Sequence, residues 1–125
     1  MNLLLDSHTL LWALHDPRRL RRDALDAIQD PSNGVFFSAA SAWELEIKCA
    51  RGKLRLPTGW LAAAERAGFV HMAIRADEAR ASAHLPWHHA DPFDRLLVAQ
   101  ARAHSLTLAT RDRAMAPYGV AILEV

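Results

Sequence analysis

The sequence contains a single cysteine, Cys49, and no apolar run long enough to cross a membrane, which needs about 18 residues. One cysteine cannot form an intrachain disulfide bond, so we expect a reducing, cytoplasmic environment. The absence of a long apolar run predicts no transmembrane helix and no membrane partner. The first apolar residues reach Asp6 too soon for a secretory signal peptide.

The sequence also lacks an excess of either charge. Fifteen Lys and Arg residues face 14 Asp and Glu residues, which gives a formal net charge of +1. This balance argues against a polybasic protein that binds duplex nucleic acid and against an acidic tail protein. The five glycines form no phosphate-binding loop, so nucleotide-dependent chemistry is not expected.

What the sequence does contain is an alternation of short apolar runs with segments of helical spacing. Its 125 residues, 51% hydrophobic and 23% charged, predict one globular domain over 1–125. The alternation predicts an α/β fold with helices on both faces of a mostly parallel sheet of four to five short strands. The expected strands are 3–5, 35–37, 69–74, 106–109 and 120–123. The expected helices are 8–14, 18–29, 38–50, 57–67, 76–84 and 92–104, with a short helix after Arg111.

Acidic residues follow or adjoin several of these strands. In open parallel sheets, ligands bind beyond the carboxyl ends of the strands. We therefore expect the acids at those ends to converge on one rim, with no lysine among them. Those acids are Asp6, Glu44, Asp94 and Asp112.

Each acid also has a simpler explanation. Asp6 and Asp112 are suited to cap the helices that follow them. The segment Asp91-Pro92-Phe93-Asp94 reads as a helix start with Asp91 as the N-cap. Glu44 and Lys48 are spaced as a helical ion pair. It is the joint placement of the four acids that favours a site.

Clustered carboxylates repel one another and need a compensating cation. Oxygen ligands of this kind suit Mg²⁺ or Mn²⁺ rather than zinc. Such an ion can activate water and neutralise a phosphodiester. The sequence therefore predicts metal-assisted hydrolysis at this rim.

The same segments resemble the PIN-domain toxins of the VapC family. The most specific match is Leu85–Ala101, which contains Asp91-Pro92-Phe93-Asp94. Leu4–Leu14, Ser38–Lys48, Gly52-Lys53-Leu54 and Leu106–Asp112 also match, in the family's order. The resemblance covers essentially the whole chain and implies a three-layer α/β/α sandwich.

The resemblance implies a function as well. By position, the metal-binding and catalytic acids of the family fall on Asp6, Glu44, Asp94 and Asp112, of which Asp112 is the more variable in the family. It implies a Mg²⁺- or Mn²⁺-dependent endoribonuclease acting on single-stranded RNA. It also implies a homodimer and an antitoxin whose C-terminal segment covers the site. Ser7 stands where the family usually has threonine, which keeps the hydroxyl.

Further residues near the acids are candidates for contacts with substrate. Arg95 and Arg111 could bind RNA phosphates, and Trp87, in a polar loop, could contact a base or a partner. Trp12 and Trp43 are expected to pack in the core or an interface, and His8 to belong to the scaffold. The adjacent pair His88-His89 lacks a third spaced ligand, so no zinc site is expected there.

Two other classes of function remain. A haloacid-dehalogenase-type phosphatase requires a second aspartate two residues after the first, where this chain has His8. A receiver domain requires paired acids before its aspartate and a later lysine, and the two lysines of this chain, Lys48 and Lys53, are misplaced for that role. A non-catalytic PIN-like module that binds RNA or a partner is the main alternative. If the four acids hold metal, the other ten acidic residues face 15 basic ones, which leaves a moderately basic surround.

Overall fold

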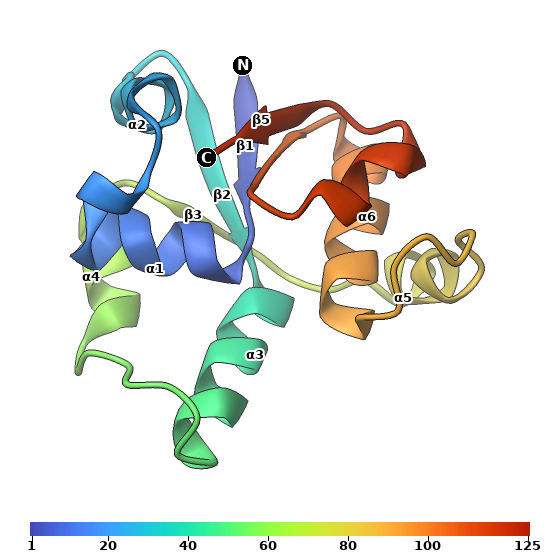
Figure 1. Ribbon diagram of the computed structural model, residues 1–125, viewed down its shortest axis with the longest axis horizontal. Helices are drawn as coiled ribbons and strands as arrows, with labels where there is room; N and C mark the ends of the chain where they lie inside the picture. The colour runs from blue at the N-terminus through green and yellow to red at the C-terminus, as the bar shows by residue number, and fades with distance from the viewer.

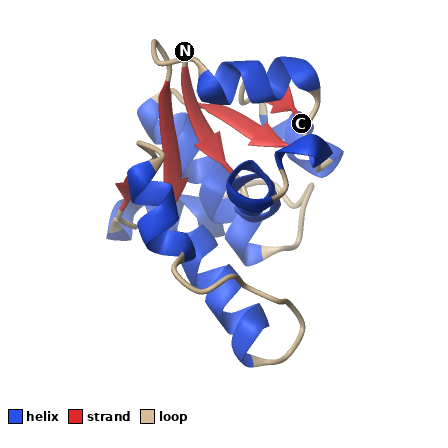
Figure 2. Ribbon diagram, turned by 90° about the vertical axis from the view of Figure 1, so that its left-hand side faces the viewer, coloured by secondary structure: helices blue, strands red, loops and turns tan.

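The computed structural model describes all 125 residues and contains one five-stranded parallel sheet. The strand order is β3-β2-β1-β4-β5, and Figure 2 shows the strands side by side, pointing the same way. Their bounds are β1 (Asn2–Leu5), β2 (Gly34–Ser38), β3 (Val70–Met72), β4 (Thr107–Thr110) and β5 (Ile122–Glu124). The predicted parallel sheet is confirmed, with every pairing parallel.

Two hydrophobic cores lie on opposite faces of this sheet. Successive side chains of a strand point to opposite faces, so Leu3 and Leu5 enter one core and Leu4 the other. The first core packs α1 (Ser7–His15), α2 (Arg22–Gln29), α3 (Ala39–Ala50) and α4 (Trp60–Arg66). The second packs α6 (Pro92–His104) and the 3₁₀ helix η2 (Arg113–Tyr118), and α5 (Ala76–Ala83) lies against α6 on the same side. Figure 1 shows α1, α2 and α4 on one side of the sheet and α5 and α6 on the other, which confirms the predicted three-layer α/β/α fold.

The element boundaries differ from the predicted ones where the backbone turns. The helix expected over 18–29 is split, because Leu20 is extended between a 3₁₀ turn, η1 (Pro17–Arg19), and α2. The helix expected over 57–67 begins only at Trp60, since Gly59 precedes it in the left-handed region at φ 77°. The strand expected over 69–74 is shorter, and the last strand begins two residues later than expected.

The chain reverses its direction of travel across the sheet at β1. From β1 it adds β2 and then β3 on one side, and afterwards it places β4 and β5 on the other. The carboxyl ends of β1 and β4 are therefore neighbours, and the Asp6 amide donates to the Ala109 carbonyl at 3.2 Å. Such a switch point is where open α/β sheets form their ligand crevice.

The structure contains no membrane-spanning helix, because none of its helices combines the length and the apolar character needed to span a bilayer.

Candidate metal centre

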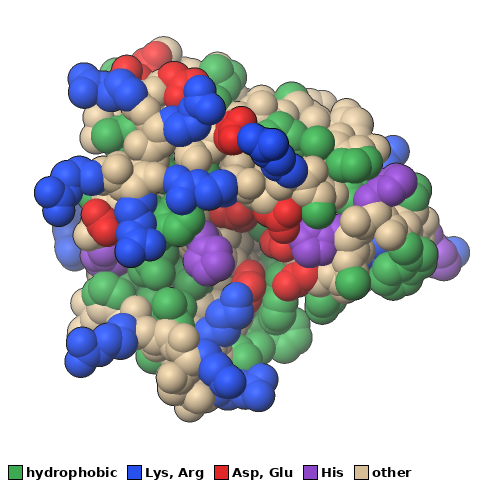
Figure 3. Space-filling model, viewed as in Figure 1, with side chains coloured by type: hydrophobic (Ala, Val, Ile, Leu, Met, Phe, Trp, Pro, Cys, Tyr) green, Lys and Arg blue, Asp and Glu red, His purple; other side chains and the backbone are tan.

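The switch point carries a small hollow of about 160 Å³ whose walls contain no hydrophobic residue. Figure 3 shows acidic side chains gathered at the middle of this face, with histidine and basic side chains around them. All four acids singled out in the sequence line the hollow together. The eight lining residues are Asp6, Ser7, His8, Glu44, Lys48, Asp91, Asp94 and Asp112.

Asp6 reaches the hollow from the end of β1 and is buried. One carboxylate oxygen caps α1 by accepting from the Thr9 amide at 2.9 Å, as the capping explanation predicts. The other accepts from the Thr110 hydroxyl at 2.5 Å, at the end of β4. Two hydrogen bonds from two elements fix the carboxylate in place, so capping and lining the hollow are compatible roles for Asp6.

Glu44 enters from α3 and is also buried. The Ser7 hydroxyl donates to one of its oxygens, and the Lys48 ammonium lies 2.7 Å from the other. The hydrogen bond with Glu44 raises the pKa of Lys48, and the charges of Asp91 and Asp94 act in the same direction. A charged lysine therefore stands at the rim, which corrects the expectation of an acidic cluster without lysine.

Asp91 and Asp94 come from the first turn of α6. Asp91 is the N-cap, accepting from the amides of Phe93 and Asp94, with Pro92 at the first helical position, as the sequence predicts. Asp94 points into the hollow one turn on. Burial, followed by the negative charges of Asp91 and Asp6, raises the pKa of Asp94 to about 7. Without a cation, the carboxyl group of Asp94 is thus partly protonated at neutral pH.

Asp112 caps η2 and is joined to Asp94 through His89. Its burial raises the pKa of Asp112, but hydrogen bonds from the Ala114 amide and from His89 outweigh this, and the pKa is lowered overall. The Nε2 atom of His89 lies 2.7 Å from a carboxylate oxygen of Asp112 and 3.0 Å from one of Asp94. The ligand atoms of these three residues lie within 4.8 Å of one another.

The tautomer of His89 follows from its other nitrogen. The Asp91 amide donates to Nδ1 at 3.1 Å, so Nδ1 carries no proton and the ring proton is on Nε2. His89 therefore donates toward Asp94 and Asp112 and orients both carboxylates. Sequence reasoning weighed His88-His89 only as a zinc pair and missed this role, because no spacing pattern signals a loop histidine between two distant acids.

Arg95 has a different role from the one predicted. Its side chain is 3% exposed, and its guanidinium donates to the carbonyls of Ser82, Leu85 and Pro86 at 2.8–2.9 Å. It also donates to the His89 carbonyl at 3.2 Å. Its donors are committed to holding the loop before α6, which argues against the predicted contact of Arg95 with an RNA phosphate.

Of the three tryptophans named in the sequence analysis, one lies against the core and two are exposed. Trp12 packs against the first core as expected, whereas Trp43 is 60% exposed and meets Phe93 edge to face. Trp87 is 74% exposed, with the Arg95 guanidinium 3.7 Å from its ring centre, so its side chain is accessible as the base-contact prediction requires.

Two more predicted residues lie on the other side of the hollow. His8, expected in the scaffold, is exposed, lines the hollow and stacks on Trp12. Arg111 donates to the Val125 carbonyl at 3.0 Å and sits over the Trp12 ring, with its side chain exposed. Its role toward phosphate stays a prediction.

The donor set of the hollow fits a hard divalent cation. Four carboxylates from three helices and a strand end offer oxygen ligands only, which suits Mg²⁺ or Mn²⁺. Burial and, after it, the charges of the neighbouring acids raise the pKa of Asp94, and a bound cation would favour the charged carboxylate again.

Comparisons with known proteins agree with this geometry. The family model described as PIN domain matches residues 3–120. No curated protein matches the sequence.

Among solved structures, the fold is similar to a chain of the VapBC2 complex from Rickettsia felis bound to a promoter DNA fragment. The TM-score is 0.72 at 14% identity, with 98% of each chain covered. It is also similar to a chain of FitAcB from Neisseria gonorrhoeae, with a TM-score of 0.61 at 23% identity, over 98% of this chain and 96% of that one. A toxin–antitoxin complex from Klebsiella pneumoniae gives 0.61 at 22% identity, with the same coverage. At these identities the likeness shows the fold alone.

Proposed function

The protein belongs to the PIN domain family, and from that premise we propose that it is the toxin of a toxin–antitoxin pair, a metal-dependent endoribonuclease that cuts single-stranded RNA. The observation that carries the proposal is the convergence of Asp6, Glu44, Asp94 and Asp112 on one hollow without hydrophobic walls. The solved relatives named as toxin–antitoxin complexes support the biological role.

In this proposal the four carboxylates hold Mg²⁺ or Mn²⁺. The bound cation supplies the charge that activates a water nucleophile and neutralises the phosphodiester. The chain's part is to keep the carboxylates in place before the cation arrives. Thr110 orients Asp6, Ser7 and Lys48 orient Glu44, and His89 orients the other two acids.

The proposal includes two partners. RNA would lie along the exposed face around the hollow, where Arg111 and Trp87 are the predicted contacts and basic side chains surround the acids (Figure 3). The antitoxin would cover the hollow with its C-terminal segment, and the toxin would form a homodimer. Both inferences extend the resemblance of this chain to toxins of the VapC family.

The proposal is tested with purified protein freed of any partner. We expect it to cut end-labelled single-stranded RNA with Mg²⁺ or Mn²⁺, and EDTA to stop the reaction. Asp6→Asn, which keeps the shape of the side chain but removes its charge, should abolish cleavage while circular dichroism shows an unchanged fold.

Two results would decide against the proposal. Cleavage that persists in EDTA would exclude the metal mechanism. RNA that is bound but never cut, with any divalent ion, would favour the alternative of a non-catalytic binding module. Mapping the ends of RNA cleaved in cells after induction would identify the substrate.

A further inference from the structure

A second, larger hollow of about 370 Å³ lies beside the metal centre. His8 lines both hollows and forms the wall between them. The second hollow is built from α1, from the 3₁₀ turn that follows it and from the segment 54–57 that leads to α4. Of these walls, only α1 also takes part in the metal centre, through Ser7 and His8.

The second hollow has an apolar floor and a basic rim. Leu54 and Trp12 contribute apolar surface, and both are half-buried. The Trp12 ring is partly covered, because His8 stacks on it and the Arg111 guanidinium lies 4.4 Å from its centre. His15, Arg19 and Arg55 stand around them and are exposed. A planar apolar surface with cations around it matches a nucleotide, whose base is planar and whose phosphate is anionic.

The donors at this rim are largely free. Arg19 pairs with Asp16 at 3.1 Å. His8, His15 and Arg55 have no hydrogen-bond or ion-pair partner among the other side chains or the backbone. Arg55 would therefore hold an anion next to the apolar surface without first breaking an internal contact.

We propose that this hollow binds one nucleotide of single-stranded RNA, adjacent to the nucleotide whose phosphate lies at the metal centre. The base contacts Leu54 and the stacked rings of His8 and Trp12, and the phosphate is bound by Arg55 and by the guanidinium nitrogens of Arg19 that do not face Asp16. The inference rests on the proposed nuclease function and adds a binding subsite to it. An acidic peptide would satisfy the basic rim but leave the apolar floor unfilled, so the nucleotide fits better.

The first experiment measures RNA affinity against salt. Fluorescein-labelled single-stranded RNA of mixed sequence is titrated in Mg²⁺ with the cleavage-deficient Asp6→Asn protein as background. Arg55→Ala should weaken binding several-fold and make the plot of log K against log salt shallower by about 0.7, the value for one lost contact with a single-strand phosphate. Arg80→Ala, an exposed arginine of α5 outside both hollows, should leave the slope unchanged.

The second experiment locates the base. RNA carrying one 4-thiouridine is photo-crosslinked to the same Asp6→Asn protein, and the modified peptides are identified by mass spectrometry. Crosslinks within residues 8–19 or 54–57 are expected. Crosslinks that fall only in other segments would refute the subsite.

The outcomes separate this inference from the proposed function. If the wild-type protein cuts RNA and Arg55→Ala behaves as Arg80→Ala does, the subsite is wrong and the nuclease stands. If Arg55→Ala weakens only the binding of a partner protein, the hollow is a protein contact and the subsite is again wrong. If the wild-type protein neither binds nor cuts RNA, both proposals fail.

Discussion

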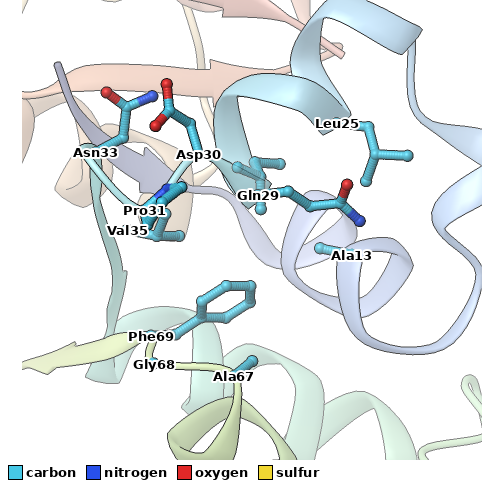
Figure 4. Close-up of a pocket in the computed structure, with 11 residues that line it drawn as sticks. Ala13, Leu25, Gln29, Asp30, Pro31, Asn33, Val35, Ala67, Gly68 and Phe69 are labelled. Carbon is cyan, nitrogen blue, oxygen red and sulfur yellow. The ribbon is translucent and has the colours of Figure 1, made fainter.

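The two ends of the sheet carry hollows of opposite character. The metal centre lies at the carboxyl ends of the strands and holds about 160 Å³ between charged and polar walls. A third hollow, of about 490 Å³, lies at the other end of the sheet and is called the amino-end hollow here. It is found where β2 begins, between α1, α2 and the residues before β3. Figure 4 shows Phe69 projecting into it, with Asp30 and Asn33 at its edge.

Asp30 and Asn33, two polar residues of this amino-end hollow, are already paired with their neighbours. Asp30 accepts from the amide and hydroxyl of Ser32, and these hydrogen bonds lower the pKa of Asp30. Asn33 donates to the Ala27 carbonyl and accepts from the N-terminal amine. At the metal centre the pKa of Asp94 moves the opposite way. The comparison teaches that converging, unrelieved charge marks the functional end, whereas cavity size does not.

The largest expected effect comes from neutralising one aspartate at each end. Asp94→Asn should reduce the rate of RNA cleavage by more than about 100-fold. Mutating a residue that only orients a metal ligand already lowers metal affinity or activity by about 10- to 100-fold, and Asp94 is proposed to be a ligand itself. Asp30→Asn, the matched change at the other end, should alter the rate by less than about a factor of two. Initial rates with Mn²⁺ measure both. Equal losses of activity in the two variants would contradict the distinction between the metal centre and the amino-end hollow.

A smaller effect is expected from the histidine that orients two of the acids. His89→Ala should weaken Mn²⁺ binding by about 10- to 100-fold, because Asp94 and Asp112 lose the donor that holds them together. Isothermal titration calorimetry gives the affinity directly. His88→Ala is the control, since the exposed His88 ring faces Tyr118 and touches none of the acids. The same affinity in both variants would show that His89 does not organise the centre.

Much of this arrangement is predictable from the sequence, because it depends on local pattern. The acids follow apolar runs, and parallel strands bring their ends together. The cap at Asp91-Pro92 is equally local. Trp43 lies outside the core, because α3 buries Ala40, Ser41, Glu44 and Leu45 along one stripe and Trp43 lies off that stripe. Of the two placements predicted for it, packing in an interface stays a prediction.

The position of His89 depends on contacts that no local pattern contains. Its amide donates to the hydroxyl of Tyr118, 29 residues away. Its carbonyl is held by Arg95, whose guanidinium also ties down the rest of the loop. An arginine beside an acidic motif suggests phosphate binding, and only the tertiary structure shows that the side chain turns inward.

The smallest expected effect is on the free energy of unfolding. Its dependence on pH is opposite to that of an aspartate whose pKa is lowered by folding. The pKa of Asp94 is raised in the folded protein, so the folded state binds the proton more tightly than the unfolded state. The stability that this proton contributes is present at low pH and is lost as pH rises through about 7.

In EDTA, the wild-type Tm should therefore fall between pH 5.5 and pH 8.5 relative to that of Asp94→Asn. Each kcal/mol corresponds to roughly 4 °C for a domain of this size, so a difference of several degrees is expected in a thermal melt. Mn²⁺ should remove the difference at high pH, because the cation replaces the proton. Parallel pH profiles for the two proteins would show that Asp94 titrates normally and that the acids at the metal centre do not repel one another as described.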